Sequence, residues 1–287
     1  MREIDKPVPH ESWMEGDTVR RGAIMLWPGR PPASAPGSEF RPWLDPVLLK
    51  GTRRRGLVVV CPGGGYVARA KHEGRPIARM FNRMGLHAVV LHYRVKPNRH
   101  PAPLMDVARA VRIARHRAKA WHVDPKRVAV CGFSAGGHLA GSLGVLWRLA
   151  PAGVRDAISR QSCRPDAMVL CYAVISSGVC GHRGSFLNLL GPRPPRTFLA
   201  KMSLERQVRK DTPPAFLWTT VEDAAVPIEN STLFAQALRA HGVPFEIHVY
   251  PKGQHGLGLA PGDPHLATWP KLCAGFFRAI GFLGGRA

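Results

Sequence analysis

The feature that most constrains the fold of this chain is a repeated alternation of short apolar runs with segments of helical periodicity. The predicted strands, rich in Val, Leu or aromatic residues and bounded by Gly, Pro or Asp, are Leu57–Cys61, His87–His92, Arg127–Cys131, Ala167–Tyr172, Ala215–Thr220 and Phe245–Tyr250. The predicted helices are Pro76–Met84, Pro103–Trp121, Gly137–Arg148, Ser231–His241 and Trp269–Ile280. Continuously apolar strands are buried on both faces, so this order predicts an α/β fold, a mostly parallel twisted sheet with helices on both faces.

The remaining segments do not divide the chain into two cores. A length of 287 residues is ordinary for one large α/β unit and no linker is visible, so residues 1–287 are predicted to form a single domain. Residues 1–50 are expected to be an irregular N-terminal segment with one or two short strands. Residues 176–214 are rich in Gly and Pro and predict a lid or pocket wall, the alternative being a surface excursion with one short helix.

The formal net charge of +22 raises the question of an anionic partner. Lys and Arg are spread along the whole chain, however, and the densest run, Arg53 to Arg55, contains no aromatic residue that could stack on a base. A solvated basic surface is therefore expected and a nucleic-acid partner is not favoured. The oligomeric state is left open.

The N-terminal and cysteine patterns bear on location. Met1 to Asp17 lacks the apolar run of a signal peptide, and no stretch approaches a membrane span of about 20 apolar residues, so a cytoplasmic protein is expected. Cys61, Cys131 and Cys171 fall inside apolar runs, where we expect reduced, buried thiols. The sequence has no metal-ligand spacing, so neither a metal nor another cofactor is expected.

The motif Gly-Phe-Ser-Ala-Gly at residues 132–136 stands directly after an apolar strand and directly before a helical run. A nucleophile elbow needs this context, because its Ser occupies a strained strand-to-helix turn that only small neighbours permit. Ser134 is therefore the predicted nucleophile. The backbone N–H of Ala135, at the start of the helix, is a predicted donor to the oxyanion.

A second glycine-rich motif, Pro-Gly-Gly-Gly-Tyr at residues 62–66, follows the first predicted strand. In a fold with a nucleophile elbow, the other oxyanion donor comes from such a loop, and Gly64 and Gly65 are both candidates. A phosphate-binding loop is the competing interpretation, but its Gly-x-x-x-x-Gly-Lys-Ser/Thr pattern is absent. A plain turn is the remaining alternative.

A serine hydroxyl needs a base, and the base needs an acid that orients it. Asp223 follows the strand at 215–220, and His255 follows the strand at 245–250, so both are predicted at carboxyl ends of parallel strands, where such sheets bind ligands. Glu222 is the alternative acid. Among the thirteen His residues, His255 alone combines this position with an adjacent Gly.

Between about Gly56 and Gly258 the chain resembles the carbohydrate esterases of the α/β-hydrolase superfamily. That group includes acetylxylan esterases and bifunctional feruloyl/acetyl esterases and is related to the hormone-sensitive-lipase group. The resemblance rests on Pro-Gly-Gly-Gly-Tyr at 62–66, His-Glu-Gly at 72–74, Tyr-Arg at 93–94, Gly-Phe-Ser-Ala-Gly-Gly-His at 132–138, His-x-Gly-Ser-x-x-x-Leu-Leu-Gly at 182–191, Asp-x-x-Val-Pro at 223–227 and Gln-His-Gly at 254–256.

The resemblance implies an α/β-hydrolase fold and a serine carboxylic-ester hydrolase that deacetylates acetylated sugars or short oligosaccharides through an acyl-enzyme. Substrate contacts are expected at Tyr66, Glu73, His182 and Ser185. A structural loop role competes for His182 and Ser185, and a solvated charge for Glu73. The alternative functions are a general short-chain, lipase-like esterase, a prolyl-oligopeptidase-type peptidase and a non-catalytic basic binding protein.

Overall fold

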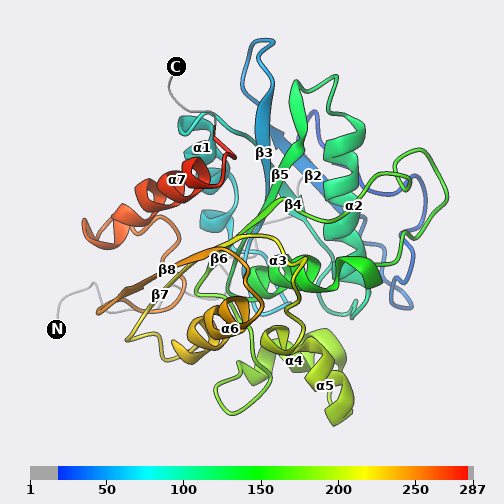
Figure 1. Ribbon diagram of the computed structural model, residues 1–287. Helices are drawn as coiled ribbons and strands as arrows, with labels where there is room; N and C mark the ends of the chain where they lie inside the picture. Colours follow the sequence, from blue (N-terminus) through cyan, green and yellow to red (C-terminus); the bar gives the residue numbers. More distant parts are fainter. Residues whose placement is uncertain (1–18, 284–287) are drawn as a thin grey trace.

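A computed structural model of the chain describes residues 19–283, through which one eight-stranded sheet runs (Figure 1). The strands are β1 (Ile24–Met25), β2 (Trp43–Val47), β3 (Arg55–Cys61), β4 (His87–His92), β5 (Val123–Phe133), β6 (Ala167–Cys171), β7 (Ala215–Thr220) and β8 (Phe245–Tyr250). They lie in the order β1-β2-β4-β3-β5-β6-β7-β8. Pairing is parallel from β4 through β8, and only β2 is antiparallel to its neighbours β1 and β4. The predicted mostly parallel sheet is confirmed.

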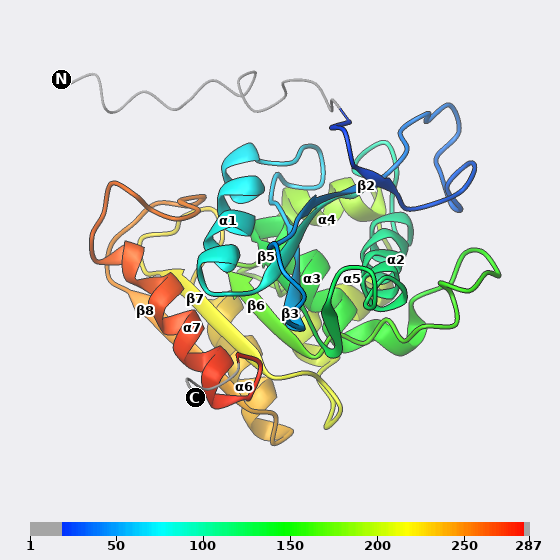
Figure 2. The same ribbon diagram turned by 90° about the horizontal axis from the view of Figure 1, so that it is seen from above.

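Helices cover both faces of this sheet, as predicted (Figure 1, Figure 2). On one face lie α1 (Arg75–Arg83) and α7 (Trp269–Ala279), and on the other lie α2 (Ala102–His116), α3 (Ser134–Leu146) and α6 (Glu229–Ala240). Alternate residues of β3 enter two separate cores, because successive side chains of a strand point to opposite faces. Leu57 and Val59 join the core under α2 and α3, whereas Val58 and Val60 join the core under α1 and α7.

The predicted helices are present, with two informative differences at their ends. The helix expected from Gly137 begins at Ser134, because the chain turns at that residue, while the weak helix propensity of Gly136 and Gly137 hides the first turn in the sequence. The helix expected to reach Trp121 ends at His116. There the backbone turns toward β5.

Two segments that the sequence left irregular carry regular structure. Residues 19–50 contain the short strands β1 and β2, in line with the expected one or two strands, while residues 1–18 lie outside the described part of the chain. Residues 176–214 contain two α-helices, α4 (Arg183–Leu190) and α5 (Arg196–Met202), and Phe186, Leu189 and Met202 of these helices join the core under α2 and α3 (Figure 1). Only one short helix was expected here, as the alternative to a lid or pocket wall, because the Gly and Pro residues around these helices conceal their periodicity.

His138 on α3 links the glycine-rich loop at residues 62–66 to the segment at 176–214. Its Nε2–H donates to the carbonyl of Met202 at 2.9 Å, and its Nδ1 accepts from the hydroxyl of Tyr66 at 2.8 Å. Since a carbonyl can only accept, these partners define the neutral tautomer. Burial lowers the pKa of His138 from 6.5 to about 4, so the ring stays neutral at pH 7.

This buried histidine predicts a loss of stability in weak acid. Between pH 6.5 and about 4 the unfolded chain binds a proton at His138 that the folded chain does not, so the free energy of unfolding falls as the pH decreases. The contribution of His138 over this window is up to about 3 kcal/mol, at 1.36 kcal/mol for each unit of pKa. Urea unfolding at pH 7 and pH 5 measures the change.

His138→Gln is the matched variant, since Gln can hydrogen-bond but does not titrate. We expect it to be less stable than the wild type at pH 7 but to lose less stability between pH 7 and pH 5. An unchanged pH dependence in the variant would show that other groups cause the acid effect.

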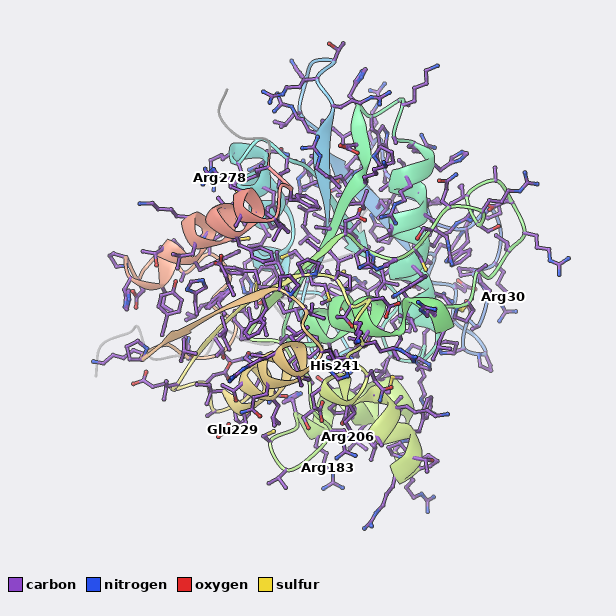
Figure 3. The ribbon with its side chains drawn as sticks, in the orientation of Figure 1. Arg30, Arg183, Arg206, Glu229, His241 and Arg278 are labelled. Carbon is purple, nitrogen blue, oxygen red and sulfur yellow. The ribbon has the colours of Figure 1, made fainter. Side chains whose placement is uncertain are left out.

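The helices and the exposed cations of the described residues bear on membrane and anionic partners. Within residues 19–283, no helix has both the length and the apolar character needed to cross a bilayer. Exposed cations occur on separate elements around the molecule rather than in one place: Figure 3 labels Arg30, Arg183, Arg206 and Arg278, which lie in a loop, on α4, beyond α5 and on α7. This distribution agrees with the solvated basic surface expected from the sequence.

Candidate active site

Ser134 lies at the tight turn between β5 and α3. Its backbone has a φ of +51°, in the left-handed region that side chains rarely adopt. The two glycines of the motif are required by close approach. A Cβ on Gly132 would collide with the carbonyl oxygen of Gly136, and one on Gly136 would collide with that of Cys61. The strained turn places the Ser134 side chain directly after the end of β5, where the residue is 8% exposed.

Three side chains from different loops form a continuous hydrogen-bonded chain. Ser134 Oγ lies 2.7 Å from His255 Nε2, and His255 Nδ1 lies 2.7 Å from Asp223 Oδ2. The other oxygen, Asp223 Oδ1, accepts from the backbone N–H groups of Ala225 and Val226 at 3.0 and 2.8 Å. A carboxylate held in this way keeps the imidazole proton on Nδ1, so Nε2 is free to accept the hydroxyl proton of Ser134.

The sheet explains why the acid and the base meet. Thr220 and Tyr250, the last residues of β7 and β8, are paired in parallel register, and Asp223 and His255 follow them in adjacent loops. Glu222, the alternative acid, lies on the exposed side and accepts from the backbone N–H of Gly253 at 3.0 Å. It therefore holds the loop before His255, whereas Asp223 is the carboxylate bonded to the imidazole.

The glycine-rich loop after β3 packs directly against the serine. A Cβ on Gly63 would lie 3.0 Å from that of Ser134, and φ is positive at Gly64, Gly65 and Tyr66. The N–H of Gly63 is already bound, because it donates to Glu73 Oε2 at 2.7 Å. Of the three glycines, Gly64 and Gly65 thus stay the candidate oxyanion donors, as the sequence analysis proposed.

Three of the four expected substrate contacts do not fit the structure, because their side chains are buried within the protein. Tyr66 is 2% exposed and its hydroxyl is bonded to His138. Glu73 is also 2% exposed, with its carboxylate bonded to Gly63 and to the hydroxyl of Tyr172, so it is not a solvated charge either. Ser185 is 1% exposed and its hydroxyl is bonded to His182. These side chains support the loops around the site and do not face a substrate.

His182 is the fourth expected substrate contact, and its partial exposure agrees with a contact to substrate. It is half-buried at the start of α4, where its Nδ1 accepts from the backbone N–H of Ser185 at 3.3 Å. Burial lowers the pKa of His182, the nearby His255 lowers it further, and Asp223 opposes the shift. The imidazole therefore lies within electrostatic reach of the base and the acid.

Tyr172 is a residue of the site that the sequence analysis did not identify. It follows β6, the strand between those that lead to Ser134 and to Asp223, and has a φ of +35°. Its ring lies edge-on to the imidazole of His255, with centroids 5.1 Å apart. The only signal in the sequence was its place at the carboxyl end of a predicted strand, where it was counted as part of the strand.

A cavity of about 970 Å³ lies away from Ser134, between the N-terminal segment, the end of β4 and the chain that follows the glycine-rich loop at residues 62–66. Its lining includes Phe40, Trp43, Arg75 and Lys96. None of Ser134, Asp223 and His255 lines it, so this cavity is not where the hydrogen-bonded serine would meet its substrate.

Comparison with known proteins places these features in context. The family model described as BD-FAE matches residues 47–238. The chain is 40% identical over 280 residues to the endo-1,4-beta-xylanase B of Butyrivibrio fibrisolvens and 32% identical over 221 residues to the acetylxylan esterase of Xylanibacter ruminicola. These matches cover 93% and 75% of the chain but only 43% and 42% of the two relatives, so the chain spans less than half of their length.

A solved structure matches over its whole length. The acetyl ester-xyloside bifunctional hydrolase from Caldicellulosiruptor lactoaceticus is 45% identical, with a TM-score of 0.89, and the match covers 94% of this chain and 100% of that one.

Proposed function

The chain belongs to the BD-FAE family of α/β-hydrolase esterases, and on that premise we propose that it is a serine carboxylic-ester hydrolase that works through an acyl-enzyme. The observation that carries the proposal is the pair of 2.7 Å contacts that His255 makes with Ser134 and Asp223. An imidazole with a hydroxyl on one nitrogen and a carboxylate on the other can activate that hydroxyl as a nucleophile.

In the proposed reaction, Ser134 Oγ attacks the ester carbonyl while His255 Nε2 takes the hydroxyl proton. Asp223 stabilises the imidazolium that forms. The N–H groups of Ala135 and of Gly64 or Gly65 bind the oxyanion. His255 then donates its proton to the departing alcohol oxygen, and a water molecule, deprotonated by the same nitrogen, hydrolyses the acyl-enzyme.

We infer that residues 176–214 form a wall of the substrate site. Asn188 on α4 donates to the carbonyl of Gly65 at 2.9 Å. This bond connects the segment to the glycine-rich loop at residues 62–66, which we call the oxyanion loop because of its proposed role. His182, at the start of the same helix, lies near the base. A wall in this position would limit the acyl group and could offer the His182 imidazole to a sugar hydroxyl.

Acetylated sugars and short oligosaccharides are the proposed substrates. The support is the relatives, one of which is an acetylxylan esterase and another an acetyl ester-xyloside hydrolase. Since each additional methylene that fits an apolar pocket adds about 1–3 kcal/mol, the preferred chain length reports the depth of the acyl pocket.

We expect acetyl esters to have a higher kcat/KM than octanoyl esters. The measurement is a p-nitrophenyl ester series from acetate to octanoate at pH 7–8, together with acetate release from acetylated xylo-oligosaccharides, using Ser134→Ala as the blank. A maximum at butyrate or beyond would instead indicate a general lipase-like esterase. Cleavage of a p-nitroanilide peptide in preference to the esters would indicate a peptidase, and no turnover of either would indicate a binding protein.

A further inference from the structure

Glu73 is a buried carboxylate in a chain poor in acidic residues, with 19 Asp and Glu against 41 Lys and Arg. The hydrogen-bond partners of its oxygens are both neutral, the backbone N–H of Gly63 and the hydroxyl of Tyr172, and His72 Nε2 lies 3.7 Å from Oε1. Burying a charge without strong hydrogen bonds is costly, so both partners are needed to stabilise it. The two partners belong to opposite sides of the candidate active site.

The first partner belongs to the oxyanion loop. Gly63 N–H donates to Glu73 Oε2 at 2.7 Å, a charge-assisted hydrogen bond that fixes the Pro62–Gly63 peptide, while the Gly63 carbonyl accepts from the N–H of Ala70 at 2.9 Å. Gly63 is also the residue of this loop that packs against Ser134. A displacement of Gly63 would therefore also move the adjoining Gly64 and Gly65, whose N–H groups are the proposed oxyanion donors.

The second partner leads to the base. Tyr172 donates its hydroxyl proton to Glu73 Oε1 at 2.6 Å, and the Tyr172 hydroxyl oxygen accepts from the backbone N–H of Gly258 at 2.9 Å. Burial and the Glu73 charge raise the pKa of Tyr172, which keeps the hydroxyl protonated as a donor. Gly258 lies three residues after His255, and the Tyr172 ring packs edge-on against the His255 imidazole.

His72, the residue before Glu73, also contacts the loop that carries His255. His72 Nε2 lies 2.8 Å from the carbonyl oxygen of Gly256, the residue directly after His255. Residues 72 and 73 thus contact the loop of the base at two points, Gly256 directly and Gly258 through Tyr172.

We propose that Glu73 is a positioning residue for the ester hydrolysis, which holds the oxyanion loop and the His255 loop in register through Gly63 and Tyr172. This inference rests on the proposed function. Glu73 touches no reacting atom. It sets the distance between the donors that bind the oxyanion and the imidazole that moves the proton, and such alignment decides how much of a reaction barrier is removed.

Glu73→Gln tests the proposal with little change in shape. Gln offers one acceptor oxygen and one donor NH2, so if its oxygen stays on the Gly63 N–H, the Tyr172 hydroxyl must accept from the NH2 instead of donating; in either orientation the charge that strengthens both hydrogen bonds is lost. We expect kcat for p-nitrophenyl acetate to fall by about 10- to 100-fold, the range that a small misplacement of reacting groups can cost. KM should change less than about threefold, since the ester does not contact Glu73.

Two further variants refine the test. Tyr172→Phe removes only the hydroxyl and should reduce kcat by a smaller factor, and the double variant should lose less than the product of the two single losses, because the residues act as one unit. Glu246→Gln is the matched control. Glu246 lies on β8, half-exposed beside His248, and its variant should keep wild-type kcat and wild-type labelling by a fluorophosphonate.

Each result supports or overturns the role of Glu73, or overturns the proposed function. Reduced kcat and slower fluorophosphonate labelling in folded Glu73→Gln, with KM preserved, support the proposal. A wild-type kcat overturns it, as does a loss that only follows the fraction of unfolded protein in urea. If Glu73→Gln does not fold, Tyr172→Phe decides, and its wild-type kcat would overturn the proposal. A wild-type protein that neither hydrolyses esters nor is labelled overturns the proposed function itself.

Discussion

Ser134→Ala is expected to lower kcat for p-nitrophenyl acetate by about 10⁴- to 10⁶-fold, as removal of the nucleophile does in a well-studied serine protease. The physical reason is the 2.7 Å contact between Ser134 Oγ and His255 Nε2, which alanine removes together with the atom that would carry the acyl group. Any residual rate would come from substrate binding and the oxyanion donors. The fold should survive, since alanine is smaller than serine at this turn.

Covalent labelling identifies the nucleophile independently of turnover. A fluorophosphonate should add once to the wild-type protein and not to Ser134→Ala, as measured by intact mass. Ser142→Ala is the matched control, because Ser142 is also a buried serine on α3 and its hydroxyl lies near His138 rather than His255. Labelling that persists in Ser134→Ala would assign the nucleophile to another residue.

Asp223→Asn is expected to lower kcat by about 10⁴-fold, the effect of the equivalent change in a serine protease triad. Asn can present its NH2 to His255 Nδ1, which stabilises the tautomer with the proton on Nε2. That nitrogen would then face Ser134 as a donor and could not accept the hydroxyl proton. The pH dependence and magnitude of kcat for p-nitrophenyl acetate measure the effect.

Glu222→Gln is the matched control for the acid. Glu222 bonds the N–H of Gly253 and not the imidazole, so this variant should lose less than about tenfold. If Glu222→Gln were the strongly impaired variant and Asp223→Asn the mild one, the acid would be misassigned, although the fold and the nucleophile would stand.

Much of the fold and the outline of the site follow from local patterns. Strand and helix periodicity predicted the sheet and the helices on both faces, because each element must bury a side that its own sequence marks. The pattern around Ser134 is equally local: a strained turn with a positive φ excludes larger neighbours, and the structure shows the close backbone contacts at Gly132 and Gly136 that require glycine. Asp223 and His255 were found by their place after parallel strands.

The roles of the polar residues around the site could not be predicted in the same way. Tyr66, Glu73 and Ser185 carry hydroxyl or carboxylate groups next to motif residues, which made substrate contact a reasonable expectation. Their exposure, however, depends on segments that are distant in the chain. Glu73 is covered by partners 10 and 99 positions away, and Tyr66 is bonded to a residue 72 positions away.

The sequence by itself determined the class of sheet, the turn that carries Ser134 and the order of nucleophile, acid and base, because these depend on periodicity and on backbone conformation within a few residues. Only the tertiary structure decided that Asp223 rather than Glu222 meets His255, and that Glu73 is buried against Gly63 and Tyr172 instead of facing solvent. The physical reason is that a hydrogen-bond partner is chosen by distance and direction in space. In this protein Glu73 contacts the loops after β3 and β6 directly and the loop after β8 through Tyr172, and no local pattern in the sequence indicates these contacts.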